Sequence, residues 1–164
     1  MIIDNELLFA DGTWAPTATG DNISPNVLDT GPLGGPVGPG TANLGRDLGQ
    51  GGKLWFVVTV KQTVTSGGAA TVDFRFRSAA NAALTTTPIE LVASSAIPKA
   101  TLVAGFTYMT PLPSAPVGTT GYQRYVGCNA NIGTAVLTAG MFHVAVLHDE
   151  QKNQKYGSGF LLDI

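Results

Sequence analysis

The residues best able to do chemistry in this 164-residue chain are its two histidines. His143 and His148 stand five positions apart in a segment, residues 141–148, that has the apolar content of a β-strand. Side chains in a strand alternate between its two faces, so an odd spacing places this pair on opposite sides. The two histidines are therefore not expected to share a metal ion. Asp149 and Glu150 follow at once, and with His148 they predict a solvated turn where the strand ends.

Three further motifs are similar to reactive sites but lack the required spacing or context. The sequence GSG at 157–159 lacks the outer spacing of a nucleophile elbow and precedes no helix. Residues 45–53 are similar to a phosphate-binding loop, but Leu54 stands where Ser or Thr is needed and a strand follows instead of a helix. Cys128, the single cysteine, has no disulfide partner and no activating neighbour in sequence, so it is predicted to be a small apolar filler in the strand YVGCNA. The sequence predicts a protein that is not an enzyme and carries no metal or cofactor.

Strand patterns dominate the elements that must position any site. The segment KLWFVVTVKQT (53–63), the connection VTSGGAA (64–70) and the segment TVDFRFRSA (71–79) predict a β-hairpin. In the second arm, apolar residues alternate with Asp73, Arg75 and Arg77, so one face is buried and the charged face predicts a local ladder of ion pairs. The first arm is apolar on both faces from Leu54 to Val58, which is typical of a central, covered strand.

The remaining segments predict an all-β fold. Strands are expected at 89–93, 101–109, 122–129, 135–137, 141–148 and 159–163, with a second hairpin around the turn 138–140. About eight antiparallel strands with long Gly- and Pro-bearing connections predict a single β-sandwich over residues 1–164 and favour a jelly roll. An immunoglobulin-like sandwich is the competing topology, but its Cys…Trp…Cys pattern is lacking. The predicted core consists of Trp55, Phe56, Val58, Val60, Phe74, Phe76 and Phe142.

A Gly/Pro-rich segment separates the first residues from the segment that begins at Lys53. Twelve of the twenty-two residues from Gly31 to Gly52 are Gly or Pro. Glycine does not recur at every third position, so a collagen triple helix is excluded. Loops of this length are uncommon and usually functional, and this one has little charge to hold it on its own domain. We expect it to be an inter-subunit contact arm, with partner contacts from Pro32, Leu33, Pro36, Val37, Pro39 and Arg46.

The composition restricts the possible partners. Charged residues make up 12% of the chain, about half of the usual ~25%, and the net charge is −2. Such a surface suits a protein that other chains cover, and it excludes nucleic acid as the main partner. The N-terminal MIIDNELLFA carries acidic residues where a signal peptide needs basic ones, and no apolar run approaches the ~20 residues of a membrane helix. The chain is expected to be made in a cytoplasm and to need no membrane.

Three stretches carry a family likeness. The sequences MIIDNELLFADG, NLGRDLGQGGKLWFVVTV and HDEQKNQKYGSGF resemble, in this order, the capsid cement (decoration) proteins of tailed bacteriophages. The Gly/Pro insertion departs from the family pattern, in which the segment before RDLG is much shorter, so the resemblance implies no contact for it.

The resemblance implies a jelly-roll protein on the outer capsid surface of a virion, made in the bacterial host. Its implied partners are the major capsid protein, whose neighbouring subunits it would bridge and stabilise, and further copies of itself in a dimer or trimer. Two alternatives stay open. A carbohydrate-binding jelly roll for surface attachment would need exposed aromatics, for which Trp14 and Tyr122 are candidates, although both suit core or strand-edge packing better. An enzyme would need a polar cluster that only the fold could assemble.

Overall fold

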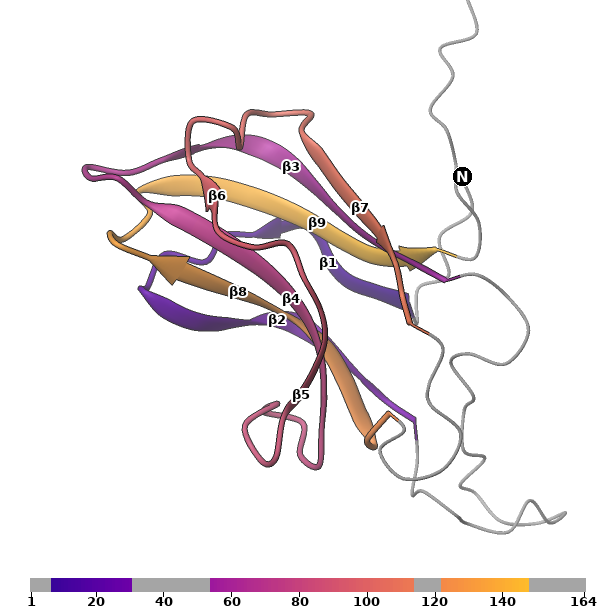
Figure 1. Cartoon of the computed structure of the whole chain (residues 1–164). Helices are drawn as coiled ribbons and strands as arrows, with labels where there is room; N and C mark the ends of the chain where they lie inside the picture. The colour runs from indigo at the N-terminus through magenta and orange to yellow at the C-terminus, as the bar shows by residue number, and fades with distance from the viewer. Residues whose placement is uncertain (1–6, 31–53, 114–121, 148–164) are drawn as a thin grey trace, which may run out of the picture.

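Two antiparallel β-sheets lie face to face in the computed structural model, which describes residues 7–30, 54–113 and 122–147 (Figure 1). The four-stranded sheet has the order β1-β9-β3-β7, and the five-stranded sheet has the order β2-β8-β4-β5 with β6 paired to β4. The strands are β1 (Leu8–Trp14), β2 (Gly20–Asp29), β3 (Trp55–Thr65), β4 (Thr71–Ala79), β5 (Ile89–Ala93), β6 (Ile97–Pro98), β7 (Thr107–Pro111), β8 (Tyr125–Gly133) and β9 (Ala139–Leu147).

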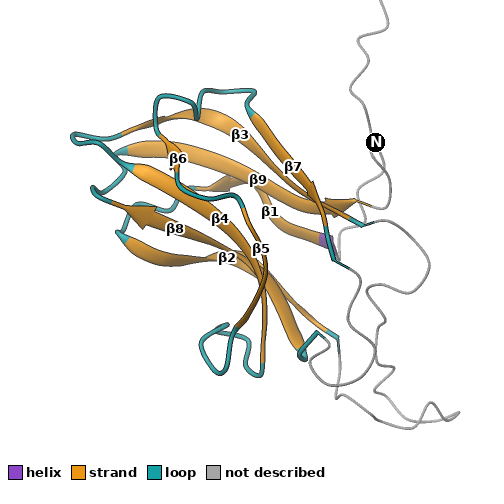
Figure 2. Ribbon diagram, viewed as in Figure 1, coloured by secondary structure: helices purple, strands orange, loops and turns teal. Residues whose placement is uncertain are grey.

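The predicted all-β sandwich is confirmed. The described residues contain no α-helix, and the short purple segment just before β1 in Figure 2 is a single 3₁₀ residue, Leu7. None of their segments is a helix long and apolar enough to cross a membrane. Strands that follow each other in the chain mostly lie in opposite sheets, as β1 to β2, β2 to β3 and β3 to β4 do. This order of eight main strands is that of a jelly roll.

The hairpin predicted for residues 53–79 is wrong, although both of its arms are strands. β3 pairs with β7 and β9, whereas β4 pairs with β5, β6 and β8 in the other sheet. The connection between them therefore crosses the sandwich. The apolar residues of both arms point into the same core, because Phe56 of β3 and Phe76 of β4 meet with ring centroids 5.3 Å apart. The alternation in β4 correctly indicates which face is buried, but it does not identify the hydrogen-bonded neighbour.

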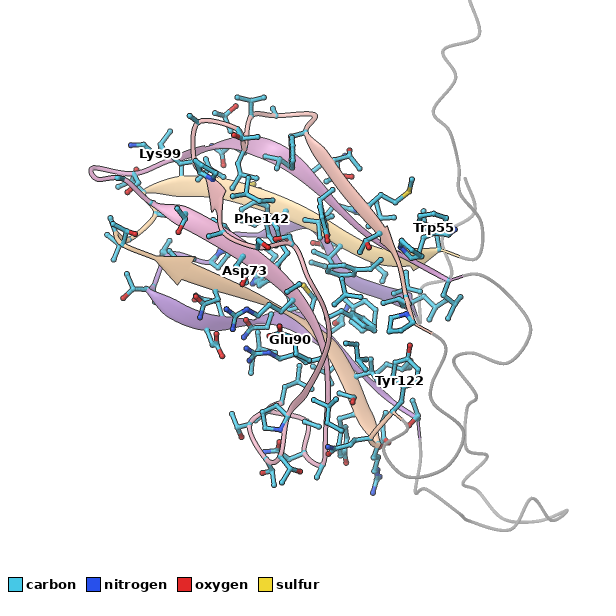
Figure 3. The ribbon with its side chains drawn as sticks, viewed as in Figure 1. Trp55, Asp73, Glu90, Lys99, Tyr122 and Phe142 are labelled. Atoms are coloured by element: carbon cyan, nitrogen blue, oxygen red, sulfur yellow. The ribbon has the colours of Figure 1, made fainter. Side chains whose placement is uncertain are left out.

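Aromatic side chains from both sheets fill the space between them. Phe76 also meets Phe9 of β1 at 5.4 Å edge to face, and Phe74 meets Phe142 of β9 at 5.0 Å. Figure 3 places Phe142 in this interior. The predicted core is confirmed at Phe56, Val58, Val60, Phe74, Phe76 and Phe142, which are at most 1% exposed. Trp55 is the exception: it is only partly buried and packs with a second, smaller cluster outside this core.

Two edge strands were not predicted. β1 and β2 each begin the order of their sheet, and each interrupts its register. In β1 a shift between Leu8 and Ala10 turns both Phe9 and Ala10 into the core. In β2 the register shifts between Ile23 and Val27, around Pro25. Bulges and proline are tolerated at sheet edges, where one side of the strand has no ladder to maintain.

The boundaries near the C-terminal half differ from the prediction in two further ways. Residues 135–137 form no strand and no hairpin with β9, because β8 and β9 lie in different sheets and the chain between them crosses the sandwich. The strand expected at 101–109 is β7, which begins only at Thr107. The strand expected at 159–163 lies outside the described residues.

Candidate functional site

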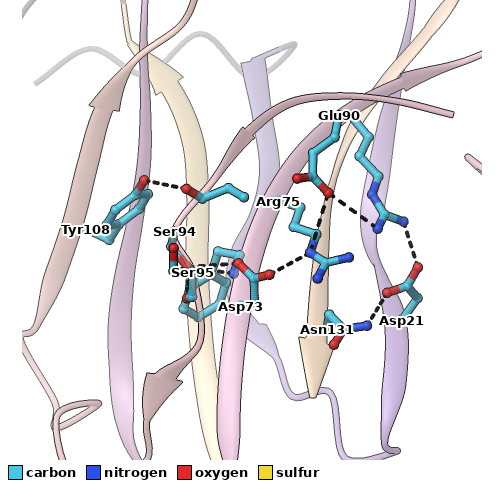
Figure 4. A network of polar contacts seen from close by, with 11 residues as sticks. Asp21, Asp73, Arg75, Glu90, Ser94, Ser95, Tyr108 and Asn131 are labelled. Carbon is cyan, nitrogen blue, oxygen red and sulfur yellow. Dashed lines mark hydrogen bonds and ion pairs between the residues drawn. The ribbon is translucent and has the colours of Figure 1, made fainter. Parts of the chain in front are cut away.

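The two sheets present outer faces of opposite character. Most charged side chains of the described residues belong to the five-stranded sheet and point away from the core. On β4, Asp73 and Arg75 form an ion pair of 2.6 Å, and Arg77 reaches Asp21 of β2 at the same distance (Figure 4). Glu90 of β5 lies 3.6 Å from Arg75 and 3.8 Å from Arg77. These five residues are called the ion-pair network below, and they confirm the predicted ladder on β4.

The charges of this network satisfy one another. Partial burial raises the pKa of Asp21, but hydrogen bonds from Asn131 and Arg77 and the positive charge of Arg77 outweigh it and hold the pKa below its ordinary value. The hydrogen bond to Asp73 raises the pKa of Arg75, which favours its charged guanidinium. At the end of the same sheet, Arg124 donates two hydrogen bonds of 2.8 Å to Asp29. Pairs of this kind at a surface contribute little stability each, and they keep a sheet face hydrated.

The connection between β4 and β5 covers part of this outer face. Leu84 is 2% exposed and lies over Gly127 of β8, where an added Cβ would come within 2.8 Å of the leucine Cδ1. The side chain of Asn81 holds the connection in shape, since its Oδ1 accepts hydrogen bonds from the backbone N–H groups of Thr85 and Thr86. A side chain at position 127 would therefore collide with Leu84, which explains why glycine stands there.

The outer face of the four-stranded sheet carries an apolar cluster instead. Val57, Ala145 and Leu147 form its centre at 1–9% exposure, and three partly buried residues pack around them. The set comprises Leu8, Trp55, Val57, Met109, Ala145 and Leu147, and is called the apolar patch below. It draws on β1, β9, β3 and β7, so it spans the whole width of the sheet.

The strand register explains how the patch is assembled. Ala145 pairs with Leu8 on one side and with Val57 on the other, and Val57 pairs with Met109, which makes one apolar row across four strands. In the next row Trp55 pairs with Leu147. Residues two apart on a strand share a face, so the rows are neighbours on the same surface.

The other half of this face is polar. Thr59 pairs with His143 and with Thr107, and Asp11 pairs with His143. Burial lowers the pKa of His143, and the nearby charge of Lys61 lowers it further, while Asp11 acts in the opposite direction. His143 is therefore neutral near pH 7, and this half is polar with little net charge.

The apolar patch lies beside one end of the sandwich. The described chain stops and resumes at Leu7, Thr30, Leu54, Pro113, Tyr122 and Leu147, all at that end (Figure 1). Leu147 of the patch is itself one of these points, and Trp55 follows another, Leu54. The predicted contact residues Pro32, Leu33, Pro36, Val37, Pro39 and Arg46 lie outside the described residues, so their contacts stay a prediction.

The other residues singled out by sequence have structural roles. Trp14 is 8% exposed and packs against Phe142, which confirms core packing. Tyr122 is partly buried and donates a hydrogen bond to the carbonyl of Pro113. Cys128 is fully buried, which raises the pKa of its thiol strongly and confirms the predicted apolar filler. Among the residues that the structure describes, no group of three or more His, Cys, Asp or Glu side chains is placed to hold a metal ion.

The apolar patch was not predicted, although one signal for it was present. The run from Leu54 to Val58 is apolar on both faces, a pattern that by itself predicts a covered central strand. In a two-sheet sandwich only one face of a strand meets the core, so a second apolar face indicates a cluster on the outside. Leu8 and Met109, which complete the patch, stand in short segments with no such run.

A comparison with family models decides the relationship of the chain. The model of the Bbp16 family matches residues 10–146, which include every strand described above except the first two residues of β1 and the last of β9. The chain belongs to the Bbp16 family. Bbp16 proteins are bacteriophage proteins, so the resemblance to a phage structural protein is supported at this level. No curated protein matches the chain significantly.

Proposed function

We propose that this Bbp16-family protein is a structural protein of the virion that binds the outside of the capsid, bridges neighbouring major capsid protein subunits and stabilises the shell. The observation that carries the proposal is the contrast between the two outer faces: one sheet is covered with paired charges, and the other carries the apolar patch. A sheet sandwich with one hydrated and one apolar outer face is suited to lie on another protein surface.

The proposed mechanism is mechanical and needs no reactive residue. A standard interface buries about 800 Å² on each partner, and at ~25 cal/mol/Å² the buried area nominally corresponds to tens of kcal/mol. Lost translational and rotational freedom and the ordering of side chains remove most of this free energy. The surplus per contact is modest, but one molecule that touches several subunits gains avidity. Self-association into a dimer or trimer would add further linked contacts.

The carbohydrate-binding alternative gains no support from the described residues. Its aromatic candidates were Trp14, which is in the core, and Tyr122, whose hydroxyl is engaged with the chain's own backbone. The charged face offers planar polar side chains, but these are paired with each other in the ion-pair network. No described feature favours glycan binding over binding to protein.

Shells assembled without this protein test the proposal. Purified protein is added to such shells filled with DNA, and the mixture is sedimented. The temperature at which the shells rupture is then followed by the fluorescence of a dye that binds the released DNA. We expect saturable co-sedimentation and a higher rupture temperature for decorated shells. A matched amount of protein unfolded by heat and cooled serves as the control. Absence of co-sedimentation, or equal rupture temperatures with full decoration, would contradict the proposed function.

A further inference from the structure

We propose that the apolar patch is the surface on which the major capsid protein docks, through an uncharged segment with apolar side chains. This inference rests on the proposed function and adds the surface and the chemistry of the partner to it. The patch, not the ion-pair network or the loops at the far end, would then contain the residues that dominate binding.

The composition of the patch is that of an interface centre. It contains a tryptophan, a methionine and four aliphatic residues, and none of its members is charged. Trp and Met are enriched in the buried centres of protein interfaces, and Trp residues often dominate the binding energy. Trp55, Leu8 and Met109 are partly exposed around the buried Ala145, so these three offer the surface that a partner would cover.

The segment that covers the patch must be uncharged, because the patch offers it apolar side chains and no charged partner. Burying an unpaired charge against apolar side chains costs far more free energy than the apolar contact contributes to binding. The charged groups on this sheet, Asp11 and Lys61, lie in its polar half: Asp11 pairs with His143, and Lys61 stands on β3 two residues after Thr59. An apolar segment of the partner fits the patch, and the polar half fits the rim of the same interface.

The capsid protein is favoured over a second copy of this chain as the occupant, because the rest of the described surface is poorly suited to bind a capsid. If two copies covered each other's patches, a shell would have to be held by the remaining described surface. That surface includes the polar half of the four-stranded sheet and the outer face of the five-stranded sheet, where Asp73, Arg75, Arg77 and Asp21 already satisfy one another. The apolar patch is the one outward-facing apolar cluster among the described residues, so it is assigned to the larger partner.

Four substitutions test the assignment by co-sedimentation with shells that lack the protein. Trp55→Ser and, independently, Met109→Ser are compared with Val136→Ser, in which an exposed valine (54%) between β8 and β9, away from the patch, receives the same replacement. Thermal unfolding first shows that each variant is folded; Met109 lies on the edge strand β7, so its variant is the safer of the two. We expect each patch variant to bind at least about tenfold more weakly and Val136→Ser to bind like wild type. Trp55→Phe should restore most of the binding.

The outcomes separate this inference from the function on which it rests. If wild type does not bind shells, the proposed function fails. If wild type binds and folded patch variants bind equally well, the function stands and the patch assignment is overturned. If the patch variants bind shells normally but change from dimer to monomer in sedimentation velocity, the occupant is a second copy and the assignment is also overturned. If removal of residues 158–164 from a Trp14→Phe chain, in which Trp55 is the remaining tryptophan, shifts the emission to the red without shells, the chain itself covers the patch, with the same consequence.

Discussion

Removal of the Phe76 ring should destabilise the sandwich more than almost any other single change. The ring is 1% exposed and lies between Phe9 at 5.4 Å and Phe56 at 5.3 Å, both on the opposite sheet. Core Phe→Ala substitutions cost about 3–5 kcal/mol, and each aromatic pair contributes about 0.5–1.5 kcal/mol beyond its buried area. Two pairs are lost together, so Phe76→Ala should cost about 4–5 kcal/mol.

Urea unfolding followed by tryptophan fluorescence measures this cost. With an m-value of about 2 kcal/mol/M, the midpoint should fall by about 2 M. Val103→Ala is the control: this valine is 49% exposed, and its variant should stay within about 0.5 kcal/mol of wild type. Phe76→Leu should fall between the two. A loss below about 1.5 kcal/mol for Phe76→Ala with an unchanged m-value would show that the ring does not join the two sheets, and would refute the packing argument.

Three further results are expected. Gly127→Ala should lower the free energy of unfolding by about 1–3 kcal/mol because the new methyl group meets Leu84. Leu84→Ala is destabilising by itself because this side chain is buried, but in urea unfolding the double variant should lose less than the sum of the two single losses. Full stability of Gly127→Ala would contradict the close approach. The pKa of Asp21 is lowered in the folded state, so its stabilisation is present above the unfolded-state pKa and is lost as the pH falls through the folded-state value. Between about pH 5 and pH 2, Asp21→Asn should therefore lose less stability than wild type in matched urea titrations, and an identical loss would show that the ion pair with Arg77 is not formed. Deletion of residues 32–39 should change the free energy of unfolding by less than about 1 kcal/mol while weakening attachment to shells. A deletion variant that unfolds easily but attaches normally would contradict the prediction that this segment is an inter-subunit contact arm.

The sequence predicted the strands whose pattern is regular. β3, β4 and β9 were found because their apolar residues are frequent or alternate, and the core face of β4 followed directly. β1 and β2 were missed because Asp11-Gly12 and Pro25 are turn signals in a sequence, and here they stand in the irregular parts of edge strands. A local pattern contains no information about whether a strand lies at an edge.

Strand partners and the surface site could not be predicted for a related reason. Alternation identifies the buried face of β4, but a sandwich offers both a neighbour in the same sheet and a neighbour across the core. The apolar patch needs the register of four strands to bring Leu8, Val57, Met109 and Ala145 into one row. That register depends on pairings between residues far apart in sequence, from Val57 with Met109 to Leu8 with Ala145, and on the bulge in β1.

A cryo-electron microscopy reconstruction of shells saturated with this protein tests the central claim most directly. The account predicts density for the jelly roll on the outer surface of the shell, with the four-stranded sheet and Trp55 against the major capsid protein and the ion-pair network towards solvent. Density on the inner surface, or an outer position in which the five-stranded sheet and Arg75 face the shell while the apolar patch remains open, would contradict it.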